Sequence, residues 1–421
     1  MPASTATAHR ATPTSLADLL DRRALRSAYQ PLVDLYSGEV VGYEALARGP
    51  RGSRLASPTA LFDAAHVAGL EHEVEWECQR AALQGALDGN LAQGQALFVN
   101  FEPRLLKADQ PEHILGLLDA ALARFSVFAE VTERSLTDRP AELLAAAERL
   151  RMRGVGVALD DVGADPRSLA LMPFLAPDLI KLDLRLVQEN PSRQIAEIVH
   201  AVGGEAERTG AFVLAEGIET EEHRRTALAL GARYGQGWLF GRPGELHPSA
   251  SGPRTPIPRP APAAQARHAS PYEAVSRQRN VRHGNKRLLL ALSRQIEQQA
   301  SGLGSAAVVL STFQQTSFFT ARTAARYQAL SQQAALVGAL GVGLSEQPAA
   351  GVRGVALGHA DPLRGEWDVT VIAPHFAMAF VARDLGDDDL DMDRRFDFAI
   401  TYDRDLAVSA ARALMSRVAD V

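Results

Sequence analysis

The sequence predicts an α/β protein with a TIM-like (β/α)8 barrel that contains one antiparallel strand, followed by a smaller mixed α/β domain. Short apolar runs alternate with helix-length amphipathic segments between about residues 16 and 242, which is the pattern of a parallel sheet. Eight such runs within about 230 residues fit a closed barrel better than an open sheet. A stretch rich in proline and alanine then precedes a second region with its own strands and helices. The 421 residues are therefore expected to form two domains.

The barrel strands are expected at eight apolar runs: residues 29–35, 40–46, 96–101, 127–131, 155–159, 179–182, 212–215 and 237–240. Helical segments, such as residues 140–153 and 192–210, separate most of these runs. Only Tyr-Ser-Gly-Glu, residues 36–39, separates the first two runs. So short a connection predicts a β-hairpin, which makes at least one strand antiparallel to its neighbour.

The C-terminal region is expected to be mixed α/β. Strand-like runs occur at residues 306–310, 335–342, 352–357, 367–372, 377–381 and 396–401. Residues 286–300 and 406–418 have the pattern of helices. The whole chain then reads as a disordered N-terminal segment (1–15), a barrel (16–245), an extended linker (246–270) and a C-terminal domain (271–421).

Composition excludes several classes of protein. A net charge of −6 does not favour a nucleic-acid or anionic-membrane partner. No stretch approaches the ~18 apolar residues of a membrane span, and the N-terminus lacks the apolar core of a signal peptide, so we expect a cytoplasmic protein. The single cysteine, Cys78, cannot form an intrachain disulfide and is expected to be a buried helix residue. Of 44 basic residues only Lys107, Lys181 and Lys286 are lysines, so a lysine at a strand end is notable.

Polar side chains lie at the C-terminal end of nearly every expected barrel strand. The active sites of such barrels are formed at these strand ends. These side chains are Glu44, Asn100, Glu130 with Glu133, Asp160 with Asp161, Lys181, Glu216 with Glu219, and Gln236. Any one of them could be a helix cap or a loop residue. Converging carboxylates, however, repel one another unless a cation lies among them. All-oxygen ligands favour Mg²⁺ or Mn²⁺ over Zn²⁺, and no Cys/His cluster with zinc spacing is present.

The adjacent pair Asp160–Asp161 suits two neighbouring ions, an arrangement that hydrolyses phosphodiesters. Lys181 would add a compact positive charge at the same mouth. A surface lysine in a salt bridge is the structural alternative. A barrel aldolase that forms a Schiff base on Lys181 is the chemical alternative. The surrounding acids argue against it, because they would keep the amine charged.

Seven motifs in order resemble those of EAL domains: YEALARG, FVNFEP, AEVTERSL, ALDDVG, IKLD, VLAEGIET and QGWLFGRP. The resemblance covers about residues 16–245. EAL domains are barrels with one antiparallel strand that hydrolyse the bacterial messenger cyclic di-GMP to linear pGpG. The resemblance therefore implies the same fold and activity here, and a homodimer formed through the barrel.

The resemblance also assigns roles to individual residues. It implies that two Mg²⁺ or Mn²⁺ ions are held by Glu44, Asn100, Glu130, Asp160, Asp161 and Glu216. Lys181 would orient the attacking water, Gln236 would lie beside it, and Glu219 would hold the loop after the fifth strand. The nucleotide groove would be lined by Gln30, Leu46, Arg48, Phe240 and Pro243. An arginine fork at position 48 also suits phosphate or guanine acceptors independently of the resemblance.

The chain departs from the family pattern in one loop. After the paired aspartates the family usually has Phe-Gly-Thr-Gly-Tyr-Ser-Ser, whereas residues 162–168 here read Val-Gly-Ala-Asp-Pro-Arg-Ser. Pro166 removes a backbone donor and Asp165 adds a negative charge. Glu102 stands where a serine is usual. The alternative function is therefore a catalytically weak or inactive receptor that binds cyclic di-GMP and signals to a partner.

Residues 271–421 resemble the DICT sensory domain, chiefly at residues 311–330, 365–385 and 393–406. The resemblance implies that this domain senses an unknown ligand or partner and modulates the barrel. Trp367 and His375 could contact a ligand, but a core tryptophan and a structural histidine are favoured. The acidic run at residues 386–393 lacks the closing glutamate of a calcium loop, so a solvated loop is favoured there.

Overall fold

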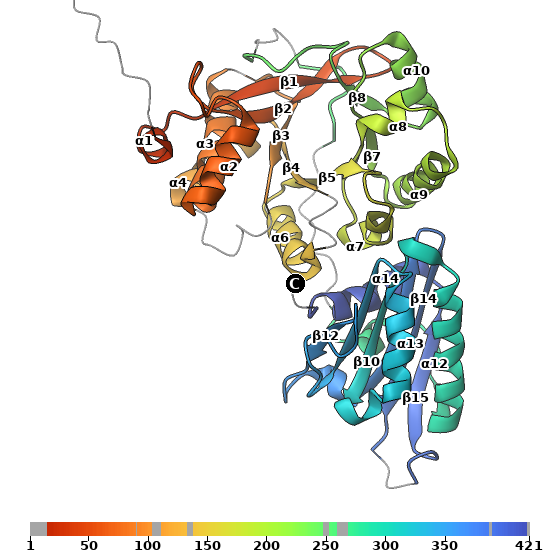
Figure 1. Ribbon diagram of the computed structural model, residues 1–421. Helices are drawn as coiled ribbons and strands as arrows, with labels where there is room; N and C mark the ends of the chain where they lie inside the picture. The colour runs from red at the N-terminus through yellow and green to blue at the C-terminus, as the bar shows by residue number, and fades with distance from the viewer. Residues whose placement is uncertain are drawn as a thin grey trace, which may run out of the picture. The chain divides into compact units, whose positions relative to one another are not determined.

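The computed structural model describes residues 15–89, 91–102, 111–132, 138–246, 252–258, 268–386 and 390–418. The expected disordered segment at residues 1–15 lies outside these ranges except for Ser15, and much of the expected linker also lies outside them. The chain divides into two compact units, residues 1–130 with 236–259, and residues 131–235 with 260–421. The first unit carries the barrel strands β1 to β4. The second carries β5 to β7, most of β8 and the C-terminal domain (Figure 1).

The helices and strands of the first unit are α1 (Leu16–Asp21), β1 (Arg26–Asp34), β2 (Val40–Arg48), α2 (Pro58–Ala68), α3 (Glu71–Asp88), β3 (Ala96–Asn100), α4 (Glu112–Leu122) and β4 (Ser126–Thr132). The barrel elements of the second unit are α6 (Pro140–Met152), β5 (Gly156–Val162), the 3₁₀ turn η2 (Pro166–Ala170), α7 (Met172–Leu175), β6 (Leu179–Leu182), α8 (Leu184–Gln188), α9 (Arg193–Thr209), β7 (Phe212–Ala215), α10 (Glu221–Ala229) and β8 (Tyr234–Gln236).

The eight strands form a closed barrel in sequence order, which confirms the expected fold class. Strands β1 and β2 pair antiparallel, with Gln30 opposite Glu44. Their turn is closed by Asp34, whose Oδ1 accepts the backbone N–H groups of Tyr36 and Ser37, each at 3.0 Å. The expected hairpin is therefore present. Neighbouring strands from β2 to β4 and from β5 to β8 pair parallel.

The eighth strand is not where the sequence placed it. The apolar run at residues 237–240 was expected to be a strand, but β8 ends at Gln236 and a turn follows. The backbone N–H of Phe240 donates to the carbonyl of Gly237 at 3.1 Å. Trp238 and Leu239 are 55% and 36% exposed, so this run owes its apolar character to surface side chains rather than to a buried strand.

Local sequence explains the helix boundaries, as α9 shows. The Ser192 side chain accepts the backbone N–H of Ile195, which satisfies one donor of the first turn. Gly210 ends the helix at φ 76°, a left-handed conformation that costs glycine little. The buried residues between these caps recur at helical spacing: Ile195, Ile198, Ala201, Val202 and Glu205.

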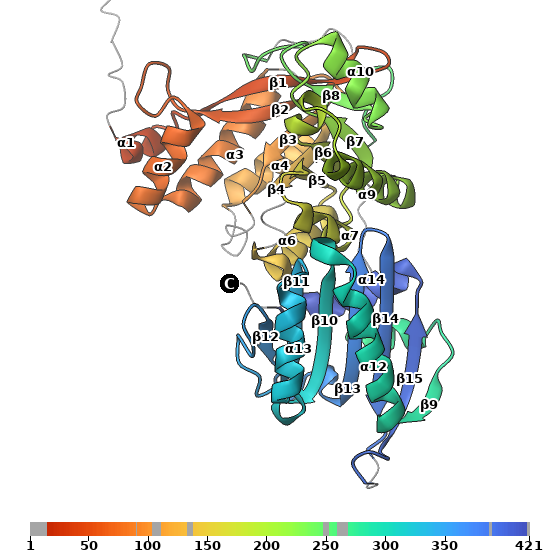
Figure 2. The ribbon, with the colours of Figure 1, turned by 45° about the vertical axis from the view of Figure 1, so that its right-hand side comes forward.

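The C-terminal domain is a seven-stranded mixed sheet in the order β12-β11-β10-β13-β14-β15-β9. Its elements are α11 (Pro271–Ser276), β9 (Arg282–Asn285), α12 (Lys286–Ser301), η3 (Gly304–Ala306), β10 (Val308–Gln315), η4 (Thr316–Phe318), α13 (Ala321–Ser331), β11 (Leu336–Val342), β12 (Arg353–Ala356), η5 (Pro362–Gly365), β13 (Glu366–Ala373), β14 (Phe376–Asp384), β15 (Arg395–Thr401) and α14 (Arg404–Met415). Helices α12 and α13 cover one face, as Figure 2 shows, and α11 and α14 pack on β13 and β14.

Trp367 is partly buried and packs against the core of this domain, in agreement with the favoured structural interpretation. Its ring meets Phe396 edge-on at 5.9 Å and Phe380 at 6.4 Å between centroids. His375 is exposed in the turn between β13 and β14. Part of the acidic run falls on residues 387–389, which lie outside the described residues. Of the rest, Asp391 pairs with Lys286 and Asp393 with Arg287.

Two titratable groups on α3 are shielded from solvent to different degrees. Cys78 is partly buried beside an apolar cluster, and burial raises the pKa of its thiol, so it behaves as a small apolar side chain. Glu75 is buried, and its Oε1 accepts the backbone N–H of Glu102 at 3.2 Å and the Gln79 amide at 3.3 Å. Burial raises the pKa of Glu75 from 4.5 to about 7, although these two hydrogen bonds oppose the shift.

Glu75 should therefore make the free energy of unfolding fall as pH rises. The unfolded chain loses the proton near its ordinary pKa of 4.5 and the folded chain only near 7. Stability is thus highest below pH ~4.5 and decreases by up to about 3 kcal/mol by the time pH exceeds ~7. We expect Glu75→Gln to flatten this slope in urea titrations between pH 4.5 and 8. Glu73→Gln, an exposed position on the same helix, serves as control. An unchanged slope in Glu75→Gln would contradict the assignment.

Candidate functional site

The carboxyl end of β5 brings two adjacent aspartates to one side of the sheet. Neighbouring side chains of a regular strand point to opposite faces. Here the register between β5 and β6 shifts between Leu159 and Val162, and Asp161 has φ 59°. This left-handed conformation is rare outside glycine, although aspartate tolerates it better than most residues. It breaks the alternation, so the Asp160 and Asp161 carboxylates can converge.

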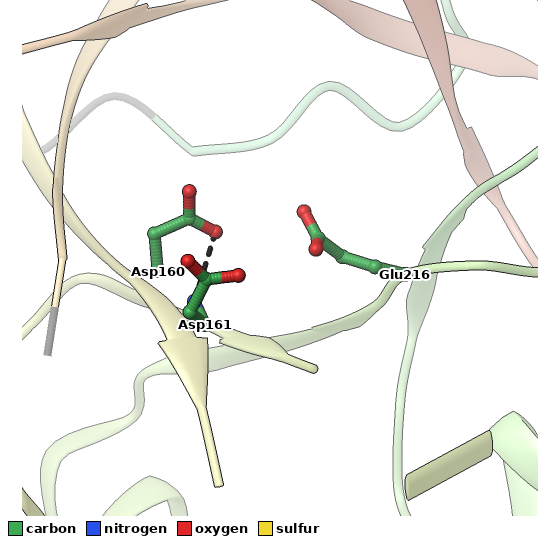
Figure 3. Close-up of side chains that lie close together, drawn as sticks. All are labelled: Asp160, Asp161 and Glu216. Atoms are coloured by element: carbon green, nitrogen blue, oxygen red, sulfur yellow. Dashed lines mark hydrogen bonds between the residues drawn. The ribbon is translucent and has the colours of Figure 1, made fainter. Parts of the chain in front are cut away.

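Glu216, one residue beyond β7, completes a cluster of three carboxylates (Figure 3). One carboxylate oxygen from each of Asp160, Asp161 and Glu216 lies within 4.8 Å of the others. The backbone N–H of Glu216 donates to the Leu182 carbonyl at 3.2 Å, which fixes this residue beside β6. The backbone N–H of Asp161 donates to Asp160 Oδ1 at 3.0 Å.

Lys181 lies under this cluster in the middle of the barrel sheet. It stands on β6 opposite Leu214 of β7, and its side chain is 1% exposed. Its Nζ is 2.9 Å from Asp160 Oδ1 and 2.7 Å from Glu216 Oε1. Two carboxylates therefore compensate the cost of burying the ammonium group. Lys181 is not a surface lysine, and the paired charges disfavour the neutral amine that a Schiff base requires.

A second polar group, formed within the first compact unit, surrounds Gln236 at the end of β8. Its Nε2 donates to Glu44 Oε2 at 2.6 Å and to Gln30 Oε1 at 3.1 Å. Gln30 in turn donates to the Gly241 carbonyl at 3.2 Å. Gln236 is 4% exposed, and its Oε1 receives no hydrogen bond from any residue that the structure describes. This buried acceptor is suited to a water molecule or another donor at the barrel mouth.

Asn100 ends β3 and Glu130 lies two residues before the end of β4, in the same unit. They lie opposite each other in the β3–β4 register, and Asn100 Nδ2 donates to Glu130 Oε2 at 3.3 Å. Glu130 is 1% exposed, whereas Asn100 is exposed. The structure thus brings Glu44 together with Gln30 and Gln236, and Asn100 together with Glu130.

The remaining expected site residues are placed as follows. Leu46 and Arg48 lie on β2, and burial together with the charge of Arg26 lowers the pKa of Arg48. Phe240 and Pro243 lie in the segment after β8. Glu219 is exposed before α10, and no side-chain hydrogen bond joins it to the loop after β5 within the described ranges. Glu133 lies outside the described residues.

The loop that departs from the family pattern is an ordered, hydrogen-bonded turn. Asp165 caps η2, since its Oδ1 accepts the Arg167 backbone N–H at 3.0 Å. Its carbonyl accepts the Ser168 hydroxyl at 2.8 Å. A side chain at Gly163, where φ is 108°, would place its Cβ 2.9 Å from Leu186 Cδ1. The turn therefore requires glycine at this position and leads the chain compactly from β5 to α7.

Asp178 was not singled out from the sequence, yet it fixes the two strands that carry the cluster. Its Oδ2 accepts the backbone N–H of Val157 at 2.8 Å, and its own N–H donates to the Val157 carbonyl at 2.8 Å. Val157 precedes Asp160 by three residues, and Asp178 precedes Lys181 by three. The only sequence signal was an aspartate directly before an apolar run, which is too common to single out.

The donor set fits a hard divalent cation. Asp160, Asp161 and Glu216 supply only oxygen atoms, which suits Mg²⁺ or Mn²⁺ rather than a thiolate-binding metal. Three negative charges and one lysine leave the cluster with an excess of negative charge, which a divalent ion would offset.

The described part of the chain contains no helix that is long and apolar enough to cross a membrane.

Comparison with known proteins agrees with these features. The family model of the EAL domain matches residues 14–243, which is more than half of the chain. A second model, described as a sensory domain in diguanylate cyclases and two-component systems (DICT), matches residues 272–385. Both expected resemblances are thus confirmed.

Among curated relatives, the cyclic di-GMP phosphodiesterase RocR of Pseudomonas aeruginosa is 32% identical over 238 residues, covering 54% of this chain and 60% of that protein. The probable cyclic di-GMP phosphodiesterase PdeB of Escherichia coli is 29% identical, covering 54% of this chain and 44% of that protein. The chain thus spans only about half the length of these relatives. A solved complex of Klebsiella pneumoniae BlrP1 with calcium and cyclic di-GMP is 31% identical, with a TM-score of 0.47 and coverage of 52% and 56%.

Replacing Lys181 should separate its electrostatic role from that of an exposed ion pair. Lys181→Met leaves the two carboxylates facing each other, so we expect a loss of about 3–5 kcal/mol in the free energy of unfolding. Mn²⁺ should restore part of this loss, because a divalent ion can lie between the carboxylates. Arg185→Met, which removes the more exposed Arg185–Asp183 pair, should cost less than about 1 kcal/mol. Equal losses in the two variants would contradict the account.

Asp161→Gly should change the free energy of unfolding and the affinity for Mn²⁺ in opposite directions. Glycine adopts φ 59° without strain, and the substitution removes one of three clustered negative charges. We expect the free energy of unfolding without metal to rise by about 0.5–1 kcal/mol, because relief of the left-handed backbone conformation exceeds the entropy that glycine adds to the unfolded chain. Mn²⁺ affinity measured by calorimetry should fall by about tenfold or more. A variant that unfolds more easily and still binds Mn²⁺ normally would contradict both expectations.

Proposed function

Because the chain belongs to the EAL domain family, we propose that it hydrolyses cyclic di-GMP to linear pGpG with divalent metal ions, under the control of its C-terminal domain. One observation carries the proposal: Asp160, Asp161 and Glu216 converge around the buried ammonium of Lys181. A cluster of this kind provides oxygen ligands and a fixed positive charge side by side. Phosphodiester hydrolysis requires both, since negative charge builds up on the phosphate in the transition state.

The metal ligands in this proposal are Glu44, Asn100, Glu130, Asp160, Asp161 and Glu216, holding two Mg²⁺ or Mn²⁺ ions. When bound, such ions acidify water and stabilise charge on the phosphate. The protein groups orient the reactants. Lys181 holds Asp160 and Glu216 in place, and the resemblance assigns it to orient the attacking water. The resemblance assigns Gln236 to lie beside this water; its amide is fixed by Glu44 and Gln30, and its buried Oε1 can accept a hydrogen bond.

The nucleotide would lie along the first compact unit. Gln30 is tied to the segment after β8 through the Gly241 carbonyl, and Phe240 and Pro243 belong to that segment. Leu46 and Arg48 follow Glu44 on β2. The Arg48 fork can bind a phosphate or a guanine edge, and its partial burial strengthens such a bond. Glu219 is assigned, by resemblance only, to holding the loop after β5.

The domain arrangement is part of the same proposal: a barrel at residues 16–245, a linker at 246–270 and a sensory domain at 271–421. A homodimer through the barrel and a cytoplasmic location stay predictions. The competing function is a receptor that binds cyclic di-GMP with little or no turnover. The replaced loop, residues 162–168, favours this alternative, because it directly follows Asp160 and Asp161 on the connection from β5 to β6.

The experiment is to incubate the purified chain with cyclic di-GMP and either Mg²⁺ or Mn²⁺, and to follow pGpG by chromatography. We expect metal-dependent pGpG. Glu44→Gln removes the negative charge of a proposed ligand, so its rate should fall by about a hundredfold or more. Glu39→Gln, a partly exposed position in the turn of the same hairpin, should keep the wild-type rate. Binding of cyclic di-GMP without any pGpG would overturn the enzyme proposal and favour the receptor.

A further inference from the structure

Helix α14, the last helix of the chain, joins two parts of the second compact unit. On one side it packs on β13, β14 and β10 of the C-terminal sheet. It also packs against α7, which belongs to the connection between β5 and β6 of the barrel. That connection links Asp160 and Asp161 to Lys181. A displacement of α14 would therefore act on the β5–β6 connection. The two ends of this connection carry the Asp160–Asp161 pair and Lys181.

Polar contacts hold α14 and its domain in this position. Arg208, near the end of α9, places its NH1 2.6 Å from Asp405 Oδ1 in the first turn of α14. Its other nitrogens bind the buried Glu205 on its own helix, the shorter distance being 2.6 Å. Arg353 of β12 donates to the carbonyl of Asp138 at 3.4 Å. The barrel part therefore presents a preformed, charged surface to the C-terminal domain.

Arg412 on α14 is partly buried. Burial and, to a smaller extent, the positive charge of Arg151 on α6 lower its pKa to about 10, while Glu148 opposes the shift.

Arg151 connects this contact to the cluster. It is 7% exposed, and its NH2 donates to the carbonyls of Leu175 and Ala176, at 2.9 and 2.6 Å, at the end of α7. Its Nε lies 3.8 Å from Asp178, the residue that fixes the register of β5 and β6 at Val157. The path from α14 to Asp160 and Lys181 therefore consists of packed and hydrogen-bonded groups.

A second contact reaches the same connection. The turn η2, which follows Asp160 and Asp161, lies against η3 and β13 of the C-terminal domain. Ser168, Leu169 and Ala170 of this turn are buried. The replaced loop thus has neighbours in the C-terminal domain, which gives a structural reason for its compact, capped form.

We propose that α14 is the surface through which the C-terminal domain controls the barrel, by holding the β5–β6 connection in the conformation in which Asp160, Asp161 and Lys181 converge. The regulatory part of this statement rests on the proposed function, whereas the coupling itself does not. A ligand or partner that shifts α14 relative to the C-terminal sheet would loosen or tighten the connection and change the metal ligands together with the lysine.

Hydrogen–deuterium exchange on the full-length chain tests the coupling without metal or substrate. Asp405→Arg places a positive charge against Arg208 and Arg404 at an exposed position, so the fold should be retained. We expect amide exchange in residues 164–176 to accelerate about threefold or more, as local opening becomes easier. Asp391→Arg is the matched control, because Asp391 is also exposed and ion-paired but within the C-terminal domain. It should leave residues 164–176 unchanged.

Wild-type exchange of residues 164–176 in Asp405→Arg would overturn the proposal. Asp405→Ala, a milder change in the same direction, decides the matter if the arginine variant does not fold. The chromatographic pGpG assay on the same proteins separates the two proposals. Faster exchange with no pGpG from any protein would leave the coupling intact and reject the phosphodiesterase. Exchange at the wild-type rate in Asp405→Arg, together with normal pGpG formation, would reject the coupling and support the phosphodiesterase.

Discussion

The buried ammonium of Lys181, held between Asp160 and Glu216, is the interaction on which the rest of the site depends. A lysine at the centre of a barrel sheet is unfavourable unless carboxylates approach it closely. Those carboxylates come from the strands on either side, β5 and β7, so the ion pairs also tie three strands together. Asp161 then joins the cluster only because its backbone adopts a left-handed conformation at the end of β5. The same charges that stabilise the lysine create an excess of negative charge that favours a divalent cation.

Much of this could be predicted from the sequence, because strand order and strand-end chemistry follow from apolar periodicity. The hairpin, seven of the eight barrel strands and the helices at residues 140–153 and 192–210 lie close to where the pattern placed them. The eighth strand was misplaced, because the exposed Trp238 and Leu239 look like core residues in a linear pattern. Strand β9 and helix α13 were missed. Strand β9 has the sequence Arg-His-Gly-Asn, which carries no apolar alternation, and α13 has few large apolar residues.

Geometry within the site was less accessible to sequence reasoning. Two adjacent aspartates suggested two ions, but the amino-acid sequence did not indicate the irregularity in β5 that lets both carboxylates lie on one side. The hydrogen bond from the Gln236 side-chain amide to Glu44 joins residues 192 positions apart, and only the closed barrel brings them together. Asp178 and Arg151 support the cluster from below without any motif of their own. The proposed function therefore requires not only the residues that the motifs identify but also supporting residues that a motif search does not reveal.

The most direct test of the central claim is a crystal of the full-length chain soaked in Mn²⁺, with anomalous difference density collected at the manganese edge. The account predicts a peak about 2.0–2.4 Å from carboxylate oxygens of Asp160, Asp161 or Glu216, with Lys181 still within hydrogen-bonding distance of the cluster. Density at this cluster would show that the carboxylates and the lysine form a metal centre. Fully soaked crystals with no peak there, and with Lys181 still paired to Asp160 and Glu216, would show that the cluster is a structural ion-pair network, and would contradict the account.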